Sequence, residues 1–230
     1  MPRFFKSDFT NEIVGDDAKH IIKSLRMQIG EELIVCDGIG FDYFCKIKEI
    51  FDNKVVLDVI NKAPSTTEPS LKVTLYQCFL KNDKFSEVIK HSVELGVTEI
   101  VPVLSTFCVS RPKKEEYKKK TEKYQKQAES AAKQSGRGII PRVLEPIDIK
   151  DVPKDAILFY ECGGEKIGDV IPKATSNNHL SILIGSEGGI SKDEAALFEN
   201  KATLGSRILR AETAPLTALS LIMYLTNNME

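Results

Sequence analysis

The sequence of 230 residues contains no tryptophan, only three histidines and only five cysteines. The cysteines are odd in number and no two have CxxC spacing, so a disulfide framework or a zinc site is not expected. Most of them lie among apolar neighbours, which predicts buried free thiols. No apolar run approaches the roughly 18 residues of a membrane span, and the N-terminus lacks the apolar region of a secretory signal. We therefore expect a cytoplasmic protein without a membrane span or a bound metal.

The two common phosphate-binding motifs are also missing. Neither GxGxxG nor GxxxxGK[ST] occurs, which disfavours a Rossmann dinucleotide site and P-loop chemistry. The net charge of −1 hides a basic middle, because residues 71–150 hold 16 Lys and Arg against 10 Asp and Glu. The densest part, residues 111–142, has 11 basic and 4 acidic residues. Such a stretch can hold phosphate groups, although a solvated helix face is the commoner explanation of a charge run.

A seam at residues 61–70 contains two prolines and small polar residues, which is typical of a linker. Before it, Asp16 or Asp17 can cap a helix whose apolar residues recur at helical spacing. Three strands are also expected there, at residues 32–38, 41–50 and 54–60, the last two forming a hairpin around residues 51–53. A short unit of this kind predicts a small closed β-barrel, a class that commonly binds nucleic acid.

After the seam, predicted strands and helices alternate. The strands are expected at residues 71–80, 99–103, 156–160, 179–185 and 204–209. The helices are expected at residues 83–95, 114–134, 192–200 and 215–227. Ser191 and Glu194 have the spacing of a capping box for the third helix, and Pro102 suggests an edge strand or a strand end. The alternation predicts a mostly parallel sheet with helices on both faces.

Two loops in this half are candidate ligand sites, because each leaves a strand and opens a helix. The first, residues 184–191, has three glycines that let the backbone approach a ligand; a tight turn without a ligand is the alternative. The second, residues 204–215, carries Arg210 and Glu212, although a surface ion pair is the commoner explanation of charges this close in sequence.

Two further segments offer polar groups to nucleic acid. Gln134 and Arg137 close the basic helix, where an ordinary glycine C-cap is the alternative. Near the N-terminus Arg3 and Arg26 stand beside apolar residues, which could equally hold the chain end to the barrel.

Seven motifs occur in one characteristic order along the chain: 3–5 (RFF), 20–30 (H…LR…G), 81–84 (KNDK), 94–102 (ELGV…I.P), 134–141 (QSGR…P), 185–189 (GSEGG) and 204–214 (LG.RILRAETA). With this combination the sequence resembles the ribosomal RNA small-subunit methyltransferases of the RsmE type, in the SPOUT superfamily. The resemblance covers essentially the whole chain.

The resemblance implies an α/β protein with two domains. Residues 1–68 would form a PUA-like β-barrel that helps to hold RNA, and residues 71–230 a trefoil-knotted SPOUT methyltransferase domain. The enzyme would be a homodimer that uses S-adenosylmethionine to methylate N3 of a uridine in 16S rRNA of the small ribosomal subunit, the one conventionally numbered 1498. The alternatives are a non-catalytic RNA-binding assembly factor and a related methyltransferase that acts on another RNA site.

The resemblance also assigns residues to roles. The cofactor-binding residues would be Leu158, Tyr160, Glu161, Ile184, Gly185, Ser186, Glu187, Gly188, Gly189, Leu204, Gly205, Ile208, Leu209, Arg210, Ala211 and Thr213. The catalytic roles come from the chemistry of transfer to uracil N3 and not from the resemblance: Glu212 is a candidate acceptor of the N3 proton, and Arg210 could stabilise charge on a uracil oxygen. The RNA-binding residues would be Arg3, Arg26, Arg111, Gln134 and Arg137, together with the basic helix.

The sequence departs from the family pattern at two positions. Ser186 stands where the family usually has proline, which loosens the turn but keeps the glycines. Lys133 stands where the family often has glutamate, so any role of that acid is in doubt here.

Overall fold

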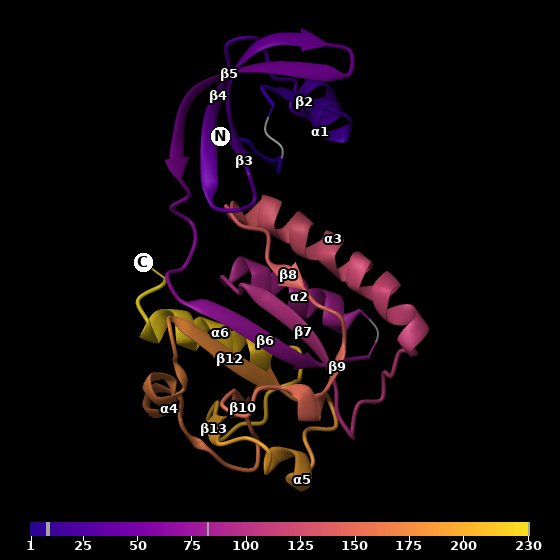
Figure 1. The fold of residues 1–230 in the computed structure, drawn as a ribbon, viewed down its shortest axis with the longest axis vertical. Coiled ribbons are helices and arrows are strands. Elements are labelled where there is room, and N and C mark those ends of the chain that lie inside the picture. The colour runs from indigo at the N-terminus through magenta and orange to yellow at the C-terminus, as the bar shows by residue number, and fades with distance from the viewer. Residues whose placement is uncertain (8–9, 82, 230) are drawn as a thin grey trace. The chain divides into compact units, whose positions relative to one another are not determined.

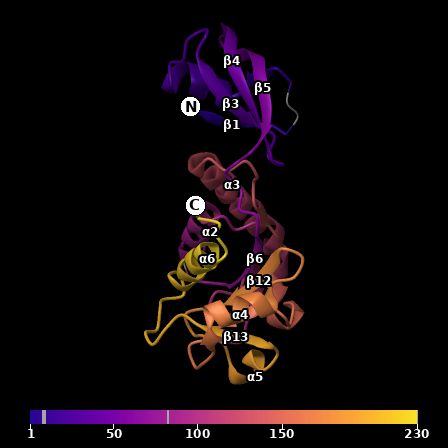
Figure 2. The same cartoon turned by 90° about the vertical axis from the view of Figure 1, so that its left-hand side faces the viewer.

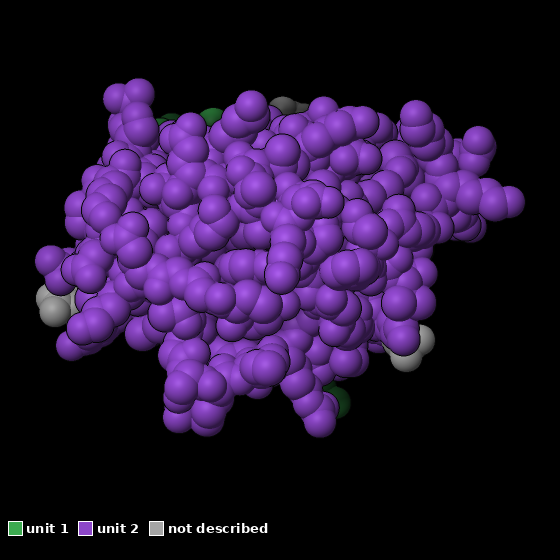
Figure 3. All heavy atoms as spheres, turned by 90° about the horizontal axis from the view of Figure 1, so that it is seen from below, with its two compact units in different colours: residues 1–68, 132–140 green, residues 69–131, 141–230 purple. Residues whose placement is uncertain are grey.

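The computed structural model describes residues 1–7, 10–81 and 83–229, and the chain divides into two compact units. The first unit comprises residues 1–68 together with residues 132–140, and the second comprises residues 69–131 and 141–230 (Figures 1 and 3). The segment 132–140 thus belongs to a unit whose other residues precede it by more than sixty positions.

A five-stranded sheet with the order β1-β3-β4-β5-β2 forms the first unit. Its strands are β1 (Arg3–Phe5), β2 (Glu12–Val14), β3 (Glu32–Cys36), β4 (Phe41–Phe51) and β5 (Lys54–Pro64). The predicted hairpin is confirmed, since β4 and β5 pair antiparallel around the turn at Asp52 and Asn53. Phe4, Ile21 and Leu33 belong to the buried core of this unit.

Two expectations for this unit need correction. The helix exists, as α1 (Asp16–Lys19) continued by a π-helical turn η1 (His20–Ser24), but Gly15 occupies the N-cap position at φ 73°. Asp16 and Asp17 instead lie in the first turn, where their charge favours the helix dipole. The linker is shorter than expected, because β5 continues to Pro64 and Asn61 pairs with Phe44.

The second unit contains an eight-stranded sheet in which the described pairings are all parallel. The order is β11-β13-β10-β12-β6-β7-β8, and β9 also pairs with β7. The strands are β6 (Lys72–Cys78), β7 (Glu99–Leu104), β8 (Arg142–Val143), β9 (Ile147–Asp148), β10 (Ile157–Phe159), β11 (Glu165–Lys166), β12 (His179–Ile184) and β13 (Asn200–Thr203). Ile182, Leu183 and Ile184 follow one another and are all buried, so both faces of the sheet are covered, as predicted.

Helices connect these strands (Figures 1 and 2). They are α2 (Lys84–Glu94), η2 (Lys114–Glu116), α3 (Tyr117–Ser135), η3 (Ile149–Asp151), α4 (Ile167–Ala174), α5 (Lys192–Ala195) and α6 (Ala214–Leu225). The long basic helix is confirmed as η2 and α3. The capping box of α5 is confirmed as well, since Ser191 and Glu194 bond reciprocally. No helix in the described part of the chain is long and apolar enough to cross a bilayer. The knot stays a prediction.

The structure corrects three expectations about these elements. The strand predicted at residues 204–209 is wrong: β13 lies earlier and begins at Asn200, the residue that was expected to end the α5 helix. The sequence-based assignment also missed α4. Pro102 lies inside β7, an interior strand, but it falls between the stretches that pair with β8 and with β9. A residue without an N–H is tolerated there because the partner strand is interrupted.

All five cysteines are free, and Cys36, Cys45, Cys78 and Cys108 are buried as expected, whereas Cys162 is exposed.

Candidate active site

The second unit has a cavity of about 540 Å³ where the carboxyl ends of three strands meet. Strands β13, β10 and β12 are neighbours in the sheet and run parallel, so the loops that follow them leave the same edge. These loops supply nearly the whole wall. The predicted cofactor-binding residues on it are Tyr160, Glu161, Ile184, Gly185, Ser186, Glu187, Gly188, Gly189, Leu204, Gly205, Ile208, Leu209, Arg210 and Ala211.

Two predicted residues do not line the cavity. Leu158 is fully buried within β10, while its neighbour Phe159 reaches the wall because successive side chains of a strand point to opposite faces. Thr213 lies just before α6, outside the wall.

The glycine-rich turn after β12 is shaped by close packing. Gly189 donates its backbone N–H to the carbonyl oxygen of Ser186 at 2.9 Å and has a φ of +74°, in the left-handed region. A Cβ atom on Gly189 would overlap a carboxylate oxygen of Glu161, and one on Gly188 would lie 2.8 Å from Cβ of Phe107. Phe107 therefore excludes a side chain at Gly188, and the left-handed φ disfavours one at Gly189, where the exposed carboxylate of Glu161 would also have to turn away. Both positions bring backbone groups to the cavity surface.

The loop after β13 lacks the predicted strand but still lines the cavity. Gly205 in this loop has a φ of +106°, and Ile208 is 84% exposed. A large apolar side chain exposed in a cavity wall offers a contact surface for a ligand. Arg210 is also on this wall and has no ion pair with any described residue.

One ammonium group joins two of the cavity loops. Lys84, at the start of α2, lies 3.1 Å from the Glu212 carboxylate and 3.9 Å from that of Glu187. The backbone N–H of Lys81 also donates to Glu187, at 3.0 Å. The sequence analysis assigned no role to Lys84, although it belongs to the 81–84 motif; Asn82 of that motif lies outside the described residues.

The same contacts set the protonation of Glu212. Partial burial acts to raise the pKa of Glu212, but its own backbone N–H and the Lys84 ammonium group hydrogen-bond to its carboxylate. With the positive charges of Lys84 and Arg210, these bonds outweigh burial and lower the pKa of Glu212 below its ordinary value. Glu212 is therefore ionised at neutral pH.

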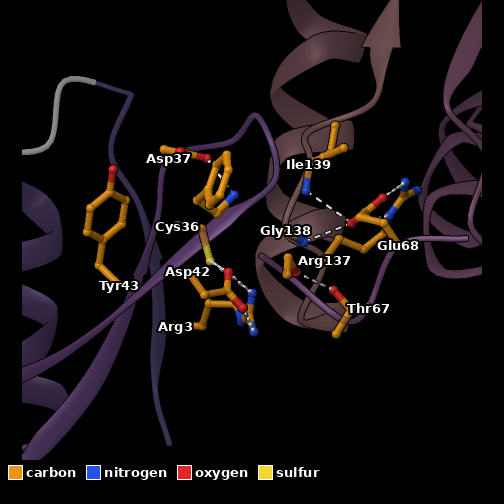
Figure 4. Close-up of polar contacts among 12 residues, drawn as sticks. Arg3, Cys36, Asp37, Asp42, Tyr43, Thr67, Glu68, Arg137, Gly138 and Ile139 are labelled. Atoms are coloured by element: carbon orange, nitrogen blue, oxygen red, sulfur yellow. Dashed lines mark hydrogen bonds and ion pairs between the residues drawn. The ribbon is translucent and has the colours of Figure 1, made fainter. Parts of the chain in front are cut away.

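Two of the predicted RNA-binding arginines are engaged in ion pairs inside the first unit (Figure 4). Arg3 makes two hydrogen bonds of 2.9 Å to the Asp42 carboxylate and a third to the sulfur of Cys36. Arg137, with a side chain only 4% exposed, lies 2.6 Å from the Glu68 carboxylate. That carboxylate also accepts the backbone N–H groups of Gly138 and Ile139.

The other three predicted RNA-binding residues are exposed. Arg111 donates to the backbone carbonyls of Ser105, Thr106 and Cys108, while Arg26 has a φ of +54° and Gln134 lies in the last turn of α3.

A second hollow lies on the second unit between α2 and α3. It is lined by Lys90, Lys119, Glu122, Lys123, Lys126, Gln127 and Ser130. None of its four lysines is paired with a carboxylate in the described part of the chain. With four lysines against the one carboxylate of Glu122, the lining of the hollow carries a net positive charge.

Comparisons with known proteins agree with these features. A family model described as an RNA methyltransferase domain matches residues 67–223, and one described as an RNA methyltransferase PUA domain matches residues 13–60. The chain is 32% identical to a ribosomal RNA small subunit methyltransferase E from Bacillus subtilis, covering 94% of this chain and 91% of that protein. It is 34% identical to the protein of the same name from Mesomycoplasma hyopneumoniae, covering 96% of this chain and 98% of that one.

A solved structure gives the same picture. A ribosomal RNA small subunit methyltransferase E from Neisseria gonorrhoeae, bound to S-adenosylmethionine, superposes with a TM-score of 0.85 at 28% identity. The match covers 98% of both chains. The fold expected from the sequence, with a PUA domain followed by an α/β RNA methyltransferase domain, is thereby confirmed.

Proposed function

Because the chain belongs to the RNA methyltransferase family, we propose that it transfers methyl groups from S-adenosylmethionine to ribosomal RNA of the small subunit. The observation that carries this proposal is the cavity at the ends of β10, β12 and β13. Its wall consists of the loops that the family resemblance assigns to the cofactor. Relatives named for this activity match nearly the whole chain.

The residues of the cavity fit S-adenosylmethionine. Gly188 and Gly189 leave backbone groups accessible to a ligand. A side chain would meet Phe107 at the first position and the carboxylate of Glu161 at the second. Ile208 offers apolar surface, and the Glu161 carboxylate can accept hydrogen bonds from hydroxyl or ammonium groups. We assign cofactor binding to the loops that contain residues 160–161, 184–189 and 204–213.

When bound, the cofactor would supply a methyl group on a sulfonium, whose sulfur leaves as a neutral thioether when the methyl group is transferred. The enzyme's task is then alignment, which can supply roughly 7–11 kcal/mol of the barrier, and activation of the nucleophile. Uracil N3 carries a proton and is a poor nucleophile until that proton leaves. We assign its acceptance to the ionised Glu212 and the stabilisation of negative charge on a uracil oxygen to Arg210. The proposed product is N3-methyluridine at position 1498 of 16S rRNA.

The proposed RNA contacts are Arg26, Gln134 and Arg111, which are exposed, and the lysines of the hollow between α2 and α3. For Arg3 and Arg137 a phosphate contact would require breaking an ion pair that is largely buried, so we assign both to holding the first unit together. The homodimer and the cytoplasmic location stay predictions.

The direct test uses small ribosomal subunits from cells that lack the enzyme. The protein is incubated with them and with isotopically labelled S-adenosylmethionine, and the modified nucleotide is located by mass spectrometry. We expect one labelled N3-methyluridine in 16S rRNA. Label at another nucleotide or at a ribose hydroxyl would contradict the assigned site. Absence of both transfer and cofactor binding by calorimetry would favour a non-catalytic assembly factor.

A further inference from the structure

Lys84 occupies an unusual position, because it meets carboxylates from two different loops of the cavity. Glu187 belongs to the glycine-rich turn after β12, and Glu212 to the loop after β13. Lys84 itself comes from a third element, the first turn of α2, and its side chain lines the same cavity. Residues 84 and 212 are 128 positions apart, so only the fold brings them together.

The two carboxylates depend on Lys84 to different degrees. Glu187 keeps a second partner, the backbone N–H of Lys81. Glu212 has Lys84 as its side-chain partner, with further support from its own backbone N–H and from the charge of Arg210. Loss of the ammonium group would therefore affect Glu212 more than Glu187.

Stability alone does not account for this arrangement. The side chains of Lys84, Glu187 and Glu212 are 34%, 25% and 19% exposed. Ion pairs that are this accessible to water contribute little to folding, typically about 0–1 kcal/mol. Their placement in the cavity wall, in contrast, controls the position and charge of groups that face the ligand.

We propose that Lys84 is a positioning residue, whose ammonium group holds the carboxylates of Glu187 and Glu212 and so fixes both cavity loops against the start of α2. The inference rests on the proposed function and deepens it, since it identifies what orients the assigned proton acceptor. Lys84 acts through Glu212 and the loops, and takes no part itself in proton or methyl transfer.

The test compares three full-length variants. Lys84→Met removes the charge, Lys84→Arg keeps it, and Lys154→Met is a control at an exposed lysine with no side-chain partner in the described structure. Unfolding by heat establishes that each is folded. For Lys84→Met we expect S-adenosylmethionine binding, measured by calorimetry, to weaken about tenfold, as for the loss of one charged hydrogen bond. Lys84→Arg should restore most of the affinity, and Lys154→Met should bind as the wild type does.

A second measurement reports on Glu212 without requiring activity. Carbon-13 NMR of protein labelled at the glutamate carboxyl groups follows the titration of Glu212, which is assigned by the signal lost in Glu212→Gln. Two cations act on this carboxylate, Lys84 on α2 and Arg210 on its own loop, and Glu187 on the turn after β12 shares the Lys84 ammonium group. We expect Lys84→Met to move the titration to higher pH by about one unit or more, and Lys84→Arg to reverse this.

The outcomes separate the two proposals. Unchanged cofactor affinity and an unchanged Glu212 titration in Lys84→Met would overturn the role of Lys84, whether or not the protein methylates RNA. If the titration and affinity shift as expected but no RNA is methylated, the proposed function fails while the placement by Lys84 stands.

Discussion

Gly189 is the residue of the glycine-rich turn whose backbone lies in the left-handed region. Its φ of +74° disfavours any side chain, and a Cβ would overlap the Glu161 carboxylate. We expect Gly189→Ala to weaken S-adenosylmethionine binding about tenfold in calorimetry, because alanine disfavours the left-handed backbone and the Glu161 carboxylate must turn away.

A matched control is Gly168→Ala in α4, where a Cβ would meet no atom within 4 Å. Alanine favours the helix there, so cofactor affinity should be unchanged and stability equal or slightly higher. Wild-type affinity in Gly189→Ala would show that the turn does not form the cofactor site.

Glu212 allows a prediction about pH. Because hydrogen bonds and nearby cations lower its pKa, its carboxylate is ionised at neutral pH and becomes protonated only in acid. If Glu212 accepts the N3 proton, kcat falls as the pH drops through this lowered pKa. At higher pH the carboxylate stays ionised, and Glu212 causes no further change of kcat with pH. Glu212→Gln should reduce kcat by about 100-fold or more at every pH from 5 to 8, a range in which the ionised wild-type carboxylate gives no acid limb, as measured by single-turnover methylation. Full activity of Glu212→Gln across the range would exclude it as the acceptor.

At the residue scale, the sequence identified loops that line the cavity but not the side chains that hold them, and the role of these loops in cofactor binding stays a prediction. The loop from Gly185 to Gly189 could be predicted because several glycines directly after an apolar run indicate a turn at the end of a strand. Lys84 could not be assigned, since its partner Glu212 is distant in sequence and a lysine in a helix start usually faces solvent. The assignment of Arg137 to RNA overlooks its burial against Glu68, because Glu68 is distant in sequence and the two residues meet only in the folded unit.

At the scale of elements, α3 carries the clearest surface prediction. Lys119, Lys123 and Lys126 lie on one face of the helix and line the hollow without carboxylate partners among the described residues. At about 1.5 Å per residue they span roughly 10 Å, enough to contact successive phosphates. We expect their joint replacement by glutamate to weaken RNA binding. The slope of log K against log salt concentration should become shallower by up to about three, one for each phosphate contact that is lost.

The control is the same exchange at Lys150, Lys154 and Lys192, which are exposed lysines outside α2 and α3. Fluorescence anisotropy with a 16S rRNA fragment at several salt concentrations measures both slopes. An unchanged slope in the α3 variant, or an equal loss in the control, would contradict a specific role of this face.

Prediction of elements worked where pattern and packing agree. The β12 strand and the α6 helix follow from long apolar runs, and the capping box located the start of α5. Residues 204–209 resemble a strand because Ile208 and Leu209 are apolar, yet Ile208 is exposed to the cavity instead of being buried in the sheet. A sequence does not distinguish an apolar residue that packs in the core from one that faces a ligand.

At the scale of the whole molecule, the first unit includes a segment that no local pattern assigns to it. Residues 132–140 follow a helix of the second unit, but Glu68 binds Arg137, Gly138 and Ile139 within the first. Residues 61–70 were expected to be a linker, and the 134–141 motif an RNA contact, so their pairing could not be foreseen. The first unit therefore contains residues from both sides of the expected linker at residues 61–70.

This arrangement predicts that Glu68 is far more important for stability than its place at the end of a linker suggests. Glu68→Ala removes the carboxylate that pairs with the nearly inaccessible Arg137 guanidinium, and loss of one partner of a buried ion pair typically costs about 3–5 kcal/mol. The matched control is Glu99→Ala, since Glu99 and Arg142 are also 2.6 Å apart but Arg142 is 74% exposed, so about 1 kcal/mol or less is expected. Urea unfolding measures both losses, and hydrogen exchange should accelerate at the amides of Gly138 and Ile139 in Glu68→Ala alone. Equal losses in the two variants, with protection of those amides intact, would mean that residues 132–140 are held in the first unit by other contacts.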